Sequence, residues 1–453
     1  MRALLLCSVA WSYLHAAEWR AGRGAVKITP PSGIPMAGYF SVRLAESTHD
    51  DLYAKAVVLE SGGKKAAIIA CDLVSIDDEL VGEARKLIES QTGIPAAHVM
   101  ISATHSHTGP LLRKRLIGFA PAAAQKIAYA YRAALPAKIG AAAKLADTAL
   151  VPVQMLEGVG REESISFYRR FLMKDGSVRT NPGKMNPEIV QPMGEIDPEV
   201  AVVQWESSGK PLATYVNFAL HLDTVGGPQF SADYAFTLGR LLAKIEAPDL
   251  LTLFTIGAAG NINHVDVKFK EPQKGHAEAK RIGSILAGEV LKTLARLKPI
   301  VAEDLRVAGE VVKLPLPTYS ASEVEKAKQA ASQFGKPRSG GQDLVHAIKV
   351  LEVADRSAAG LRAEVQVIAL GDRLAWVGLP GEIFVELGAA IKKASPFERT
   401  IVVELANGSI HYVPTRKAFQ EGSYEPTNAL CAPGGGELLA DAAIRLLAKV
   451  HRR

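Results

Sequence analysis

The stretch Val99-Met-Ile-Ser-Ala-Thr-His-Ser-His-Thr-Gly-Pro110 is the most informative part of this sequence. It starts as a β-branched, apolar run, which is typical of a buried strand, and the Gly-Pro pair ends that strand. His105 and His107 therefore lie at a strand end, where α/β proteins usually place their chemistry. Residues two apart in an extended chain face the same side, so both imidazoles can point into one cavity as metal ligands. The alternative is a pair of surface histidines in a turn.

Segments rich in Val, Ile and Ala alternate with amphipathic helical patterns along the rest of the chain. The patterns predict strands at residues 54–59, 65–73, 99–103, 200–205, 212–220, 250–256, 365–370, 373–379 and 400–406. They predict helices at residues 77–91, 120–143, 237–244, 276–296, 321–333 and 438–450. This alternation predicts an α/β fold with mixed β-sheets flanked by helices.

Residues 1–17 have the pattern of a signal peptide, with Arg2 before an apolar run and Ala16-Ala17 at its end. The apolar run is too short to span a bilayer, and no later stretch reaches the length of a transmembrane segment. We therefore expect an exported protein of bacterial origin, periplasmic or secreted. Residues 18–453 are predicted to form a single catalytic domain.

The composition is that of an ordinary globular protein, with 48% hydrophobic and 22% charged residues. The formal net charge of +6 is spread along the chain without a basic block, so nucleic-acid binding is not expected. After removal of the signal peptide only Cys71 and Cys431 remain. They are either one disulfide or two buried thiols, and their spacing leaves both possibilities open.

Four further segments place a ligand-type side chain where an apolar strand meets Gly or Pro. His221 ends one such strand, Asp233 precedes a helix, Glu382 follows another strand, and His411 and Tyr412 lie in a late turn. Each also has a purely structural interpretation: a carbonyl-bound histidine, a helix N-cap, or an acid favoured by a helix dipole. Nitrogen and oxygen ligands of these types are the ones that a catalytic zinc ion uses. Their spacing alone does not show that they converge.

The chain resembles the neutral, non-lysosomal ceramidases, in particular their catalytic domain, from about Gly22 to the C-terminus. The Thr104–Pro110 segment is the most specific part of this resemblance. The other shared segments are Gly24-Ala-Val-Lys-Ile-Thr-Pro-Pro31, Met36-Ala-Gly-Tyr39, His49-Asp-Asp-Leu-Tyr-Ala-Lys-Ala56, Phe167-Tyr-Arg-Arg170, Ile196-Asp-Pro-Glu199, Pro380-Gly-Glu382 and Gly434-Gly-Gly436.

The resemblance implies one Zn²⁺ ion bound by two histidines, a glutamate and a tyrosine. By motif these ligands are His105, His221, Glu382 and Tyr412, with Tyr424 as the alternative tyrosine. The implied reaction is hydrolysis of the ceramide amide to a fatty acid and sphingosine by metal-activated water.

Four further residues are candidates for catalysis. The resemblance implies that His107 faces the substrate, and Asp233 is a second candidate. In ceramidases a serine takes part in catalysis within a Gly-Asp-Val-Ser-Pro-Asn-like segment, but here Asn263 stands at the serine position. An amide cannot act as a nucleophile, although it can donate a hydrogen bond to an oxyanion. His264, the next residue, is a candidate extra ligand or base.

The sequence departs from ceramidases at its end as well, because it stops after the predicted helix 438–450 where they continue into a β-sandwich domain. We therefore expect a shortened relative, and three functions remain open. The first is a zinc amidase acting on ceramide or another N-acyl lipid. The second is a zinc enzyme acting on a polar amide, ester or modified sugar, with Arg169 and Arg170 holding a carboxylate or sulfate. The third is a non-catalytic exported protein that retains the fold.

Overall fold

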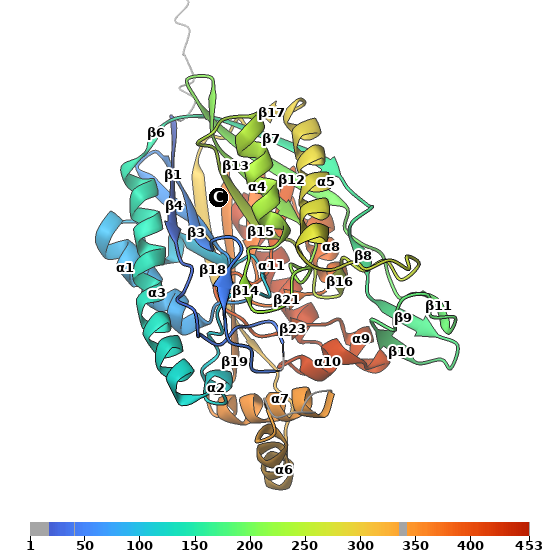
Figure 1. Ribbon diagram of the computed structural model, residues 1–453. Coiled ribbons are helices and arrows are strands. Elements are labelled where there is room, and N and C mark those ends of the chain that lie inside the picture. The colour runs from blue at the N-terminus through green and yellow to red at the C-terminus, as the bar shows by residue number, and fades with distance from the viewer. Residues whose placement is uncertain (1–17, 40, 335–341, 453) are drawn as a thin grey trace, which may run out of the picture.

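The computed structural model describes residues 18–39, 41–334 and 342–452 (Figure 1). The predicted signal peptide, residues 1–17, lies outside the described residues. Within the described part of the chain, no helix is both long and apolar enough to cross a membrane.

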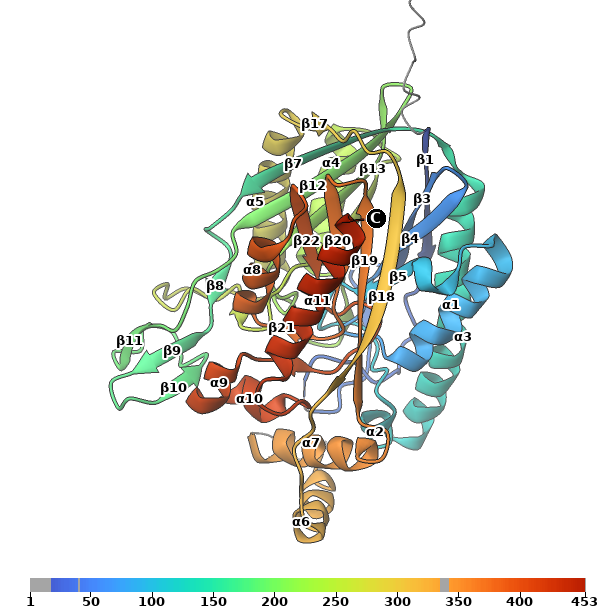
Figure 2. The same cartoon turned by 180° about the vertical axis from the view of Figure 1, so that it is seen from behind.

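Three β-sheets form the body of the molecule (Figures 1 and 2). The first sheet has the order β5-β4-β3-β1-β6, with strands Val99–Ala103, Lys64–Cys71, Tyr53–Ser61, Trp19–Lys27 and Val151–Pro152. The second has the order β15-β13-β12-β7-β17, with strands Leu251–Ile256, Lys210–Phe218, Glu199–Ser207, Gln154–Arg161 and Lys298–Pro299. The third has the order β18-β19-β20-β22, with strands Leu305–Leu314, Leu361–Leu370, Leu374–Gly378 and Arg399–Val403. All three are mixed sheets, as the sequence predicted.

Helices cover the outer faces of these sheets (Figures 1 and 2). The long helices are α1 (Asp78–Thr92), α3 (Ala122–Thr148), α4 (Tyr234–Ile245), α5 (His276–Leu294), α6 (Ala321–Ala331), α7 (Gln342–Arg356), α8 (Val385–Ala394) and α11 (Gly435–His451). The short ones are α2 (Lys114–Ile117), α9 (Arg416–Glu421) and α10 (Tyr424–Asn428). The remaining strands are β2 (Ser47–Thr48), β8 (Phe167–Tyr168), β9 (Arg170–Met173), β10 (Val178–Thr180), β11 (Ile189–Pro192), β14 (Gln229–Phe230), β16 (Ile262–Asn263), β21 (Glu382–Ile383) and β23 (Tyr412–Val413).

A single apolar cluster at the centre of the molecule joins the inner faces of all three sheets. It contains Leu59 from β3, Trp205 from β12, Tyr215 from β13 and Trp376 from β20. Alternate residues of a strand point to opposite faces, so the neighbouring positions face the helices instead. Both faces of these strands are buried, and their sequences are therefore continuous apolar runs.

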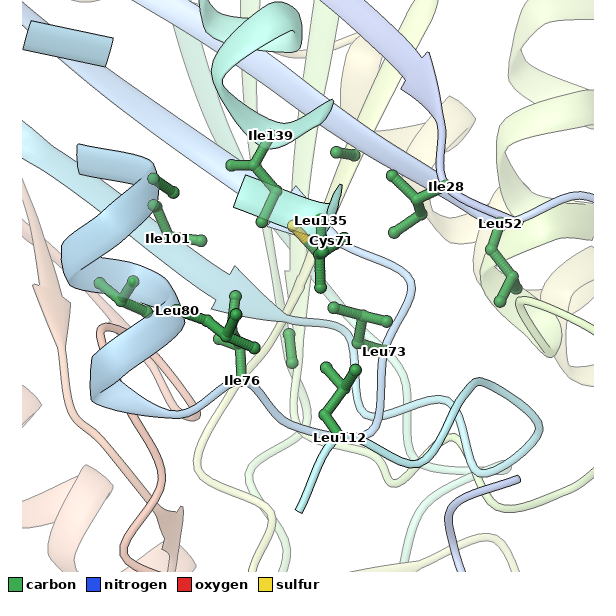
Figure 3. Packing of buried hydrophobic residues seen from close by; sticks show 14 of the residues in the cluster. Ile28, Leu52, Cys71, Leu73, Ile76, Leu80, Ile101, Leu112, Leu135 and Ile139 are labelled. Carbon is green, nitrogen blue, oxygen red and sulfur yellow. The ribbon is translucent and has the colours of Figure 1, made fainter. Parts of the chain in front are cut away.

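Each sheet has a second apolar cluster on its outer face, beneath helices. Beneath α1 and α3, Leu80, Leu135 and Ile139 pack with Cys71 and Ile101 of β4 and β5 (Figure 3). Similar clusters lie beneath α4 and α5 and beneath α8 and α11. A central core with three helix-covered outer faces is thus built from one chain.

Every long element that the sequence predicted is present, with ends shifted by a few residues. The predictions missed β1, β7, β18 and α7. Cys71 and Cys431 are both free and buried, and they belong to different apolar clusters. The structure therefore supports two buried thiols rather than a disulfide.

Three parallel strand pairs bring distant loops together. β4 pairs with β5, β13 with β15, and β20 with β22, all in parallel. The carboxyl ends of β5, β13 and β20 lead into His105, His221 and Glu382 respectively. Backbone hydrogen bonds join these loops directly, from His107 N–H to Leu222 O (3.0 Å) and from Ala103 N–H to Leu405 O (3.1 Å).

Candidate metal centre

The side chains of His105, His221 and Glu382 meet at one point. Glu382 Oε2 lies 3.5 Å from His105 Nε2 and 3.3 Å from His221 Nε2. His105 and His221 are almost fully buried. No hydrogen-bond partner satisfies Glu382 Oε2 among the described residues, although this oxygen is buried. The structure thus brings together three of the four ligands that the sequence predicted.

These separations suit a zinc ion. Zn–N and Zn–O bonds of about 2.0–2.1 Å in a tetrahedral arrangement place neighbouring ligand atoms roughly 3.3 Å apart. A buried carboxylate oxygen and two imidazole nitrogens at nearly this spacing form a cradle for a cation. The described residues therefore fit the metal that the resemblance implied.

Hydrogen bonds fix the orientation of two histidines on the Thr104–Pro110 segment. His105 Nδ1 lies 2.7 Å from the carbonyl oxygen of Val74, and His107 Nδ1 lies 3.1 Å from that of Gly38. A carbonyl can only accept, so each Nδ1 carries the proton and each Nε2 keeps its lone pair. The two Nε2 atoms are 3.2 Å apart.

The point where the side chains of His105, His221 and Glu382 meet is hereafter the metal point. His107 is therefore as close to it as a ligand would be. Ligand nitrogens of His105, His107 and His221 all lie within 4.8 Å of one another. The sequence interpretation gave His107 a role toward the substrate. The geometry is compatible with that role and also adds His107 to the candidate ligands.

Tyr412 lies beside Glu382 in a two-residue parallel ladder, in which β21 pairs with β23. Its ring is 5.5 Å from the ring of Tyr424, and both tyrosines line the same cavity. The structure places both candidate tyrosines at the centre and does not choose between them. His411, the neighbouring residue, lines the same cavity, and its Nε2 lies 3.0 Å from Glu352 Oε2, so its imidazole faces another carboxylate.

The charges at the centre are strongly coupled. Burial opposes ionisation of Glu382, but His105 and His221 outweigh burial and hold the pKa of Glu382 well below its usual value. Burial and the Arg169 cation lower the pKa of His221 to about 4. Burial alone would lower the pKa of His105, yet the Glu382 carboxylate raises it overall. An anionic Glu382 facing imidazole lone pairs is the charge distribution that a divalent cation requires.

Arg169 and Arg170 form a buried ion-pair network rather than a solvated strand edge. Arg169 Nε bonds Glu425 Oε1 at 2.9 Å, and Arg170 Nη1 bonds Glu425 Oε2 at 2.8 Å. Arg170 also bonds Glu421 Oε2 at 3.0 Å and is fully buried, so its guanidinium has carboxylate partners within the protein. This corrects the prediction that Arg170 holds a substrate anion.

Arg169 alone reaches the metal centre. Its Nη1 lies 3.3 Å from His221 Nε2, and its guanidinium carbon lies 5.3 Å from the centre of the Tyr412 ring. It is the only one of the two arginines placed to stabilise negative charge at the centre. Its Nη2 donates to the carbonyl of Gly260 at 2.7 Å, which ties it to the segment that carries Asn263.

Asn263 lies outside the lining of the metal cavity. Its Nδ2 donates to Asn181 Oδ1 at 2.7 Å, and its Oδ1 accepts from Val265 N–H at 3.0 Å. It belongs to β16, which pairs with β8. These bonds favour a role in stabilising the turn over the predicted donation to an oxyanion.

His264 is also held by other groups. Nδ1 lies 3.0 Å from Asp223 Oδ1, and Nε2 lies 2.7 Å from the carbonyl oxygen of Gln273. Burial opposes protonation, but Asp223 raises the pKa of His264 to about 8. A doubly donating imidazolium has no lone pair for a metal or a proton. His264 is therefore neither an extra ligand nor a base in this arrangement.

Asp233 is the N-cap of α4. One carboxylate oxygen accepts from Tyr234 N–H at 2.7 Å and the other from Val225 N–H at 2.8 Å. Burial raises its pKa to about 6. Its oxygens bond backbone N–H groups at a helix start, which favours the structural alternative over the predicted catalytic role.

The metal point opens into a cavity of about 100 Å³, hereafter the metal cavity. One part of its lining is apolar, from Val74, Leu111, Leu112 and Leu116. The other part is polar and includes Ser75, Arg113, Ser409, His411, Tyr424 and Asn428. A second, larger cavity of about 820 Å³ adjoins it, with Tyr39 in the lining of both.

The sequence did not identify several residues around the centre. Glu404 is fully buried and accepts from Ile383 N–H at 2.7 Å and Ala259 N–H at 3.1 Å, so it holds the Glu382 loop against the Gly257–Asn263 segment. Gly260 permits this approach, because a Cβ there would lie 2.4 Å from the carbonyl oxygen of Glu382. A lone glutamate in an apolar strand, Val-Val-Glu-Leu, was the available signal for Glu404.

The fold and site define an α/β protein with a buried histidine–carboxylate centre at the ends of its strands. No family model and no curated protein matches the chain. Among solved structures, the neutral ceramidase from Pseudomonas aeruginosa has 18% sequence identity and a TM-score of 0.72, over 96% of this chain and 75% of that one. A ceramidase complexed with C2 has the same identity and TM-score, over 96% of this chain and 76% of that chain. The chain therefore has the neutral ceramidase fold, as the sequence resemblance implied.

Proposed function

We propose that this protein is a zinc-dependent hydrolase that cleaves an amide bond, with ceramide or another N-acyl lipid as the first candidate substrate. The observation that carries the proposal is the convergence of Glu382 Oε2 with two imidazole nitrogens at 3.3 and 3.5 Å. The likeness to ceramidase structures adds support at the level of the fold.

His105, His221 and Glu382 would hold the ion, with Tyr412 as the fourth ligand. A bound zinc ion would supply an activated water and polarise the scissile carbonyl. Burial raises the pKa of Tyr424 to about 12, so its phenol stays protonated at neutral pH. Tyr424 can therefore donate a hydrogen bond to the developing oxyanion, while the Arg169 cation stabilises its charge. His107 Nε2 keeps a lone pair and would accept a hydrogen bond from a water bound beside it.

The second candidate is a polar amide, ester or modified sugar. Arg113, Ser75, Ser409 and His411 in the lining of the metal cavity favour this class, since a lipid chain gains nothing from such neighbours. A cavity of about 100 Å³ is also small for a long acyl chain. The larger cavity beyond Tyr39 has room for one. The two candidates therefore differ in which cavity holds the acyl group.

The test is turnover of a fluorescent short-chain ceramide and of a panel of polar N-acyl amides and esters. The purified protein is assayed as isolated, after chelator treatment, and after zinc is restored. Chelator-sensitive turnover that zinc restores, and that is lost in Glu382→Gln, is the expected result. A zinc-bound protein that cleaves only polar substrates would select the second candidate. A folded protein that binds no zinc and cleaves nothing would overturn the proposal and leave a non-catalytic protein with this fold.

A further inference from the structure

A second group of metal-type ligands lies outside both cavities described above, where the chain leaves β2 and where α5 begins. His49, Asp50 and His276 each place one ligand atom within 4.8 Å of the others. The rings of His49 and His276 are stacked, with centroids 3.7 Å apart and planes inclined by 13°. The fold alone creates this contact, because more than 200 residues separate the two histidines.

Asp50 orients His49. Its Oδ2 lies 2.8 Å from His49 Nδ1 and also accepts from Ser231 Oγ at 2.7 Å, while its Oδ1 accepts from Ala232 N–H at 2.6 Å. A carboxylate fixed as an acceptor places the proton on His49 Nδ1, so Nε2 keeps its lone pair. A carboxylate behind a histidine is the usual arrangement around a metal-binding imidazole.

His276 is the first residue of α5 and is half-buried. Burial and the neighbouring His49 lower its pKa, so its ring stays neutral and retains a lone pair. The positive end of a helix opposes a cation at this position. The buried carboxylate of Asp50 offsets that effect.

We propose that His49 and His276 together bind a second metal ion, of the imidazole-preferring class that includes Zn²⁺, Ni²⁺ and Cu²⁺, with Asp50 orienting His49. Lone pairs lie in the ring planes, so the two parallel rings turn apart to direct both nitrogens at one ion. The side chain of His49 is 43% exposed and that of His276 is partly exposed, so both have room to turn. Water fills the remaining coordination positions, which makes this site weaker than the buried centre.

The position of the His49–His276 site determines which of its residues can be changed without disturbing the buried centre. Asp50 also supports the Thr104–Pro110 segment through Ser231, whose hydroxyl it accepts from. The carbonyl of Ser231 in turn accepts from Ser106 Oγ at 2.6 Å and Thr108 Oγ1 at 3.0 Å. A change at Asp50 would therefore disturb both metal positions. His276→Ala removes one proposed ligand and leaves this support in place.

The experiment is a calorimetric titration of the metal-free protein with Zn²⁺ and, separately, Ni²⁺ near pH 7.5, with bound metal counted by mass spectrometry. We expect two ions per wild-type chain, one in His276→Ala, one in His221→Ala and none in the double variant at the same concentrations. His276→Ala should weaken the second site at least about tenfold and leave the first unchanged. His451→Ala, at another partly exposed histidine, is the matched control and should bind two ions.

Ni²⁺ should also raise the melting temperature of His221→Ala but not that of the double variant. One ion per wild-type chain that His276→Ala retains, or two ions in His276→Ala, would overturn the proposal and leave the two rings as a simple stacked pair. These outcomes are separate from the proposed function, because loss of the buried centre alone leaves the His49–His276 site intact.

Discussion

Glu382 and Tyr412 are paired residues of a parallel two-strand ladder, so the backbone sets the metal-facing carboxylate beside the phenol. The ladder is supported from behind, where Glu404 accepts from Ile383 N–H. The position of Glu382 is thus determined by backbone hydrogen bonds, and its side chain contributes charge to the centre rather than to folding.

Glu382→Gln should therefore abolish zinc binding while the protein still folds. The substitution keeps the side chain's volume and removes the negative charge that faces His105 and His221. The loss of affinity should exceed the roughly 10- to 100-fold that removal of an outer partner costs. Metal content after dialysis measures this, and circular dichroism checks the fold. Glu386→Gln is the matched control, because the side-chain bonds of Glu386 within the described residues go to Tyr168 and Asn261, away from the metal point. Normal zinc affinity in Glu382→Gln would remove Glu382 from the ligand set.

Arg170→Met should destabilise the protein without changing its metal content. The substitution leaves Glu425, which is fully buried, with Arg169 as its remaining cation. Breaking a buried ion pair on one side costs about 3–5 kcal/mol. Urea unfolding followed by fluorescence measures the change. A loss below about 1 kcal/mol would mean that Arg170 is free for another role, such as contact with a substrate anion.

The His264–Asp223 pair should make stability depend on pH between about 6.5 and 8. The folded protein raises the pKa of His264 to about 8 from the usual 6.5, so the pair's contribution is complete below pH 6.5. It is lost as pH rises through 8, because the folded state then releases the proton that it held. The difference corresponds to about 2 kcal/mol. In His264→Gln, the difference between the free energies of unfolding at pH 6 and pH 9 should be smaller than in the wild type. An equal pH slope in both proteins would contradict this assignment.

The sequence predicted the fold well because the strands and helices follow simple rules of periodicity. It also singled out His105, His221 and Glu382, because each follows a buried strand at a Gly or Pro; their role as metal ligands was implied by the resemblance and stays a prediction. Three other candidates remain less certain, because a polar residue beside a turn has two physical explanations. Asp233, Asn263 and His264 turned out to satisfy backbone groups or a neighbouring carboxylate. Only three-dimensional contacts separate such residues from catalytic ones.

The ion-pair network of Arg169, Arg170 and Glu425 shows the same limit of prediction from local sequence. Arg169 and Arg170 are adjacent, yet one reaches the metal centre and the other does not. Their common partner, Glu425, is more than 250 residues away in sequence. No local pattern encodes that pairing, since it depends on how α10 packs beside β10.

Asn263→Ala should leave turnover within a few-fold of wild type. The side chain bonds Asn181 and Val265 N–H and does not line the metal cavity. Its loss should therefore destabilise the turn rather than change the site. The cost in stability should be about 1–3 kcal/mol, as for other buried polar groups that lose a partner. Kinetics with whichever substrate the panel yields, together with urea unfolding, measure both effects. A turnover rate reduced by about 100-fold or more would restore the oxyanion role.

His107→Ala tests which residues bind the ion. Catalytic zinc usually takes three protein ligands and keeps a position for water, and His105, His221 and Glu382 already make three. His107 and Tyr412, which lie beside them, are the two candidates for a fourth ligand. The bond from His107 Nδ1 to the Gly38 carbonyl directs Nε2 at the centre, so its lone pair suits either a metal or a water proton.

We expect His107→Ala to keep zinc and lose rate, by the roughly 100- to 10,000-fold that proton-transfer groups supply. Tyr412→Phe, in contrast, should weaken zinc binding. Competition with a chromophoric chelator measures both affinities. The reverse pattern, with zinc lost in His107→Ala and kept in Tyr412→Phe, would define a centre of three histidines and a glutamate. Tyr412 would then join Tyr424 as a hydrogen-bond donor, and the phenol ligand implied by the resemblance would be wrong for this chain.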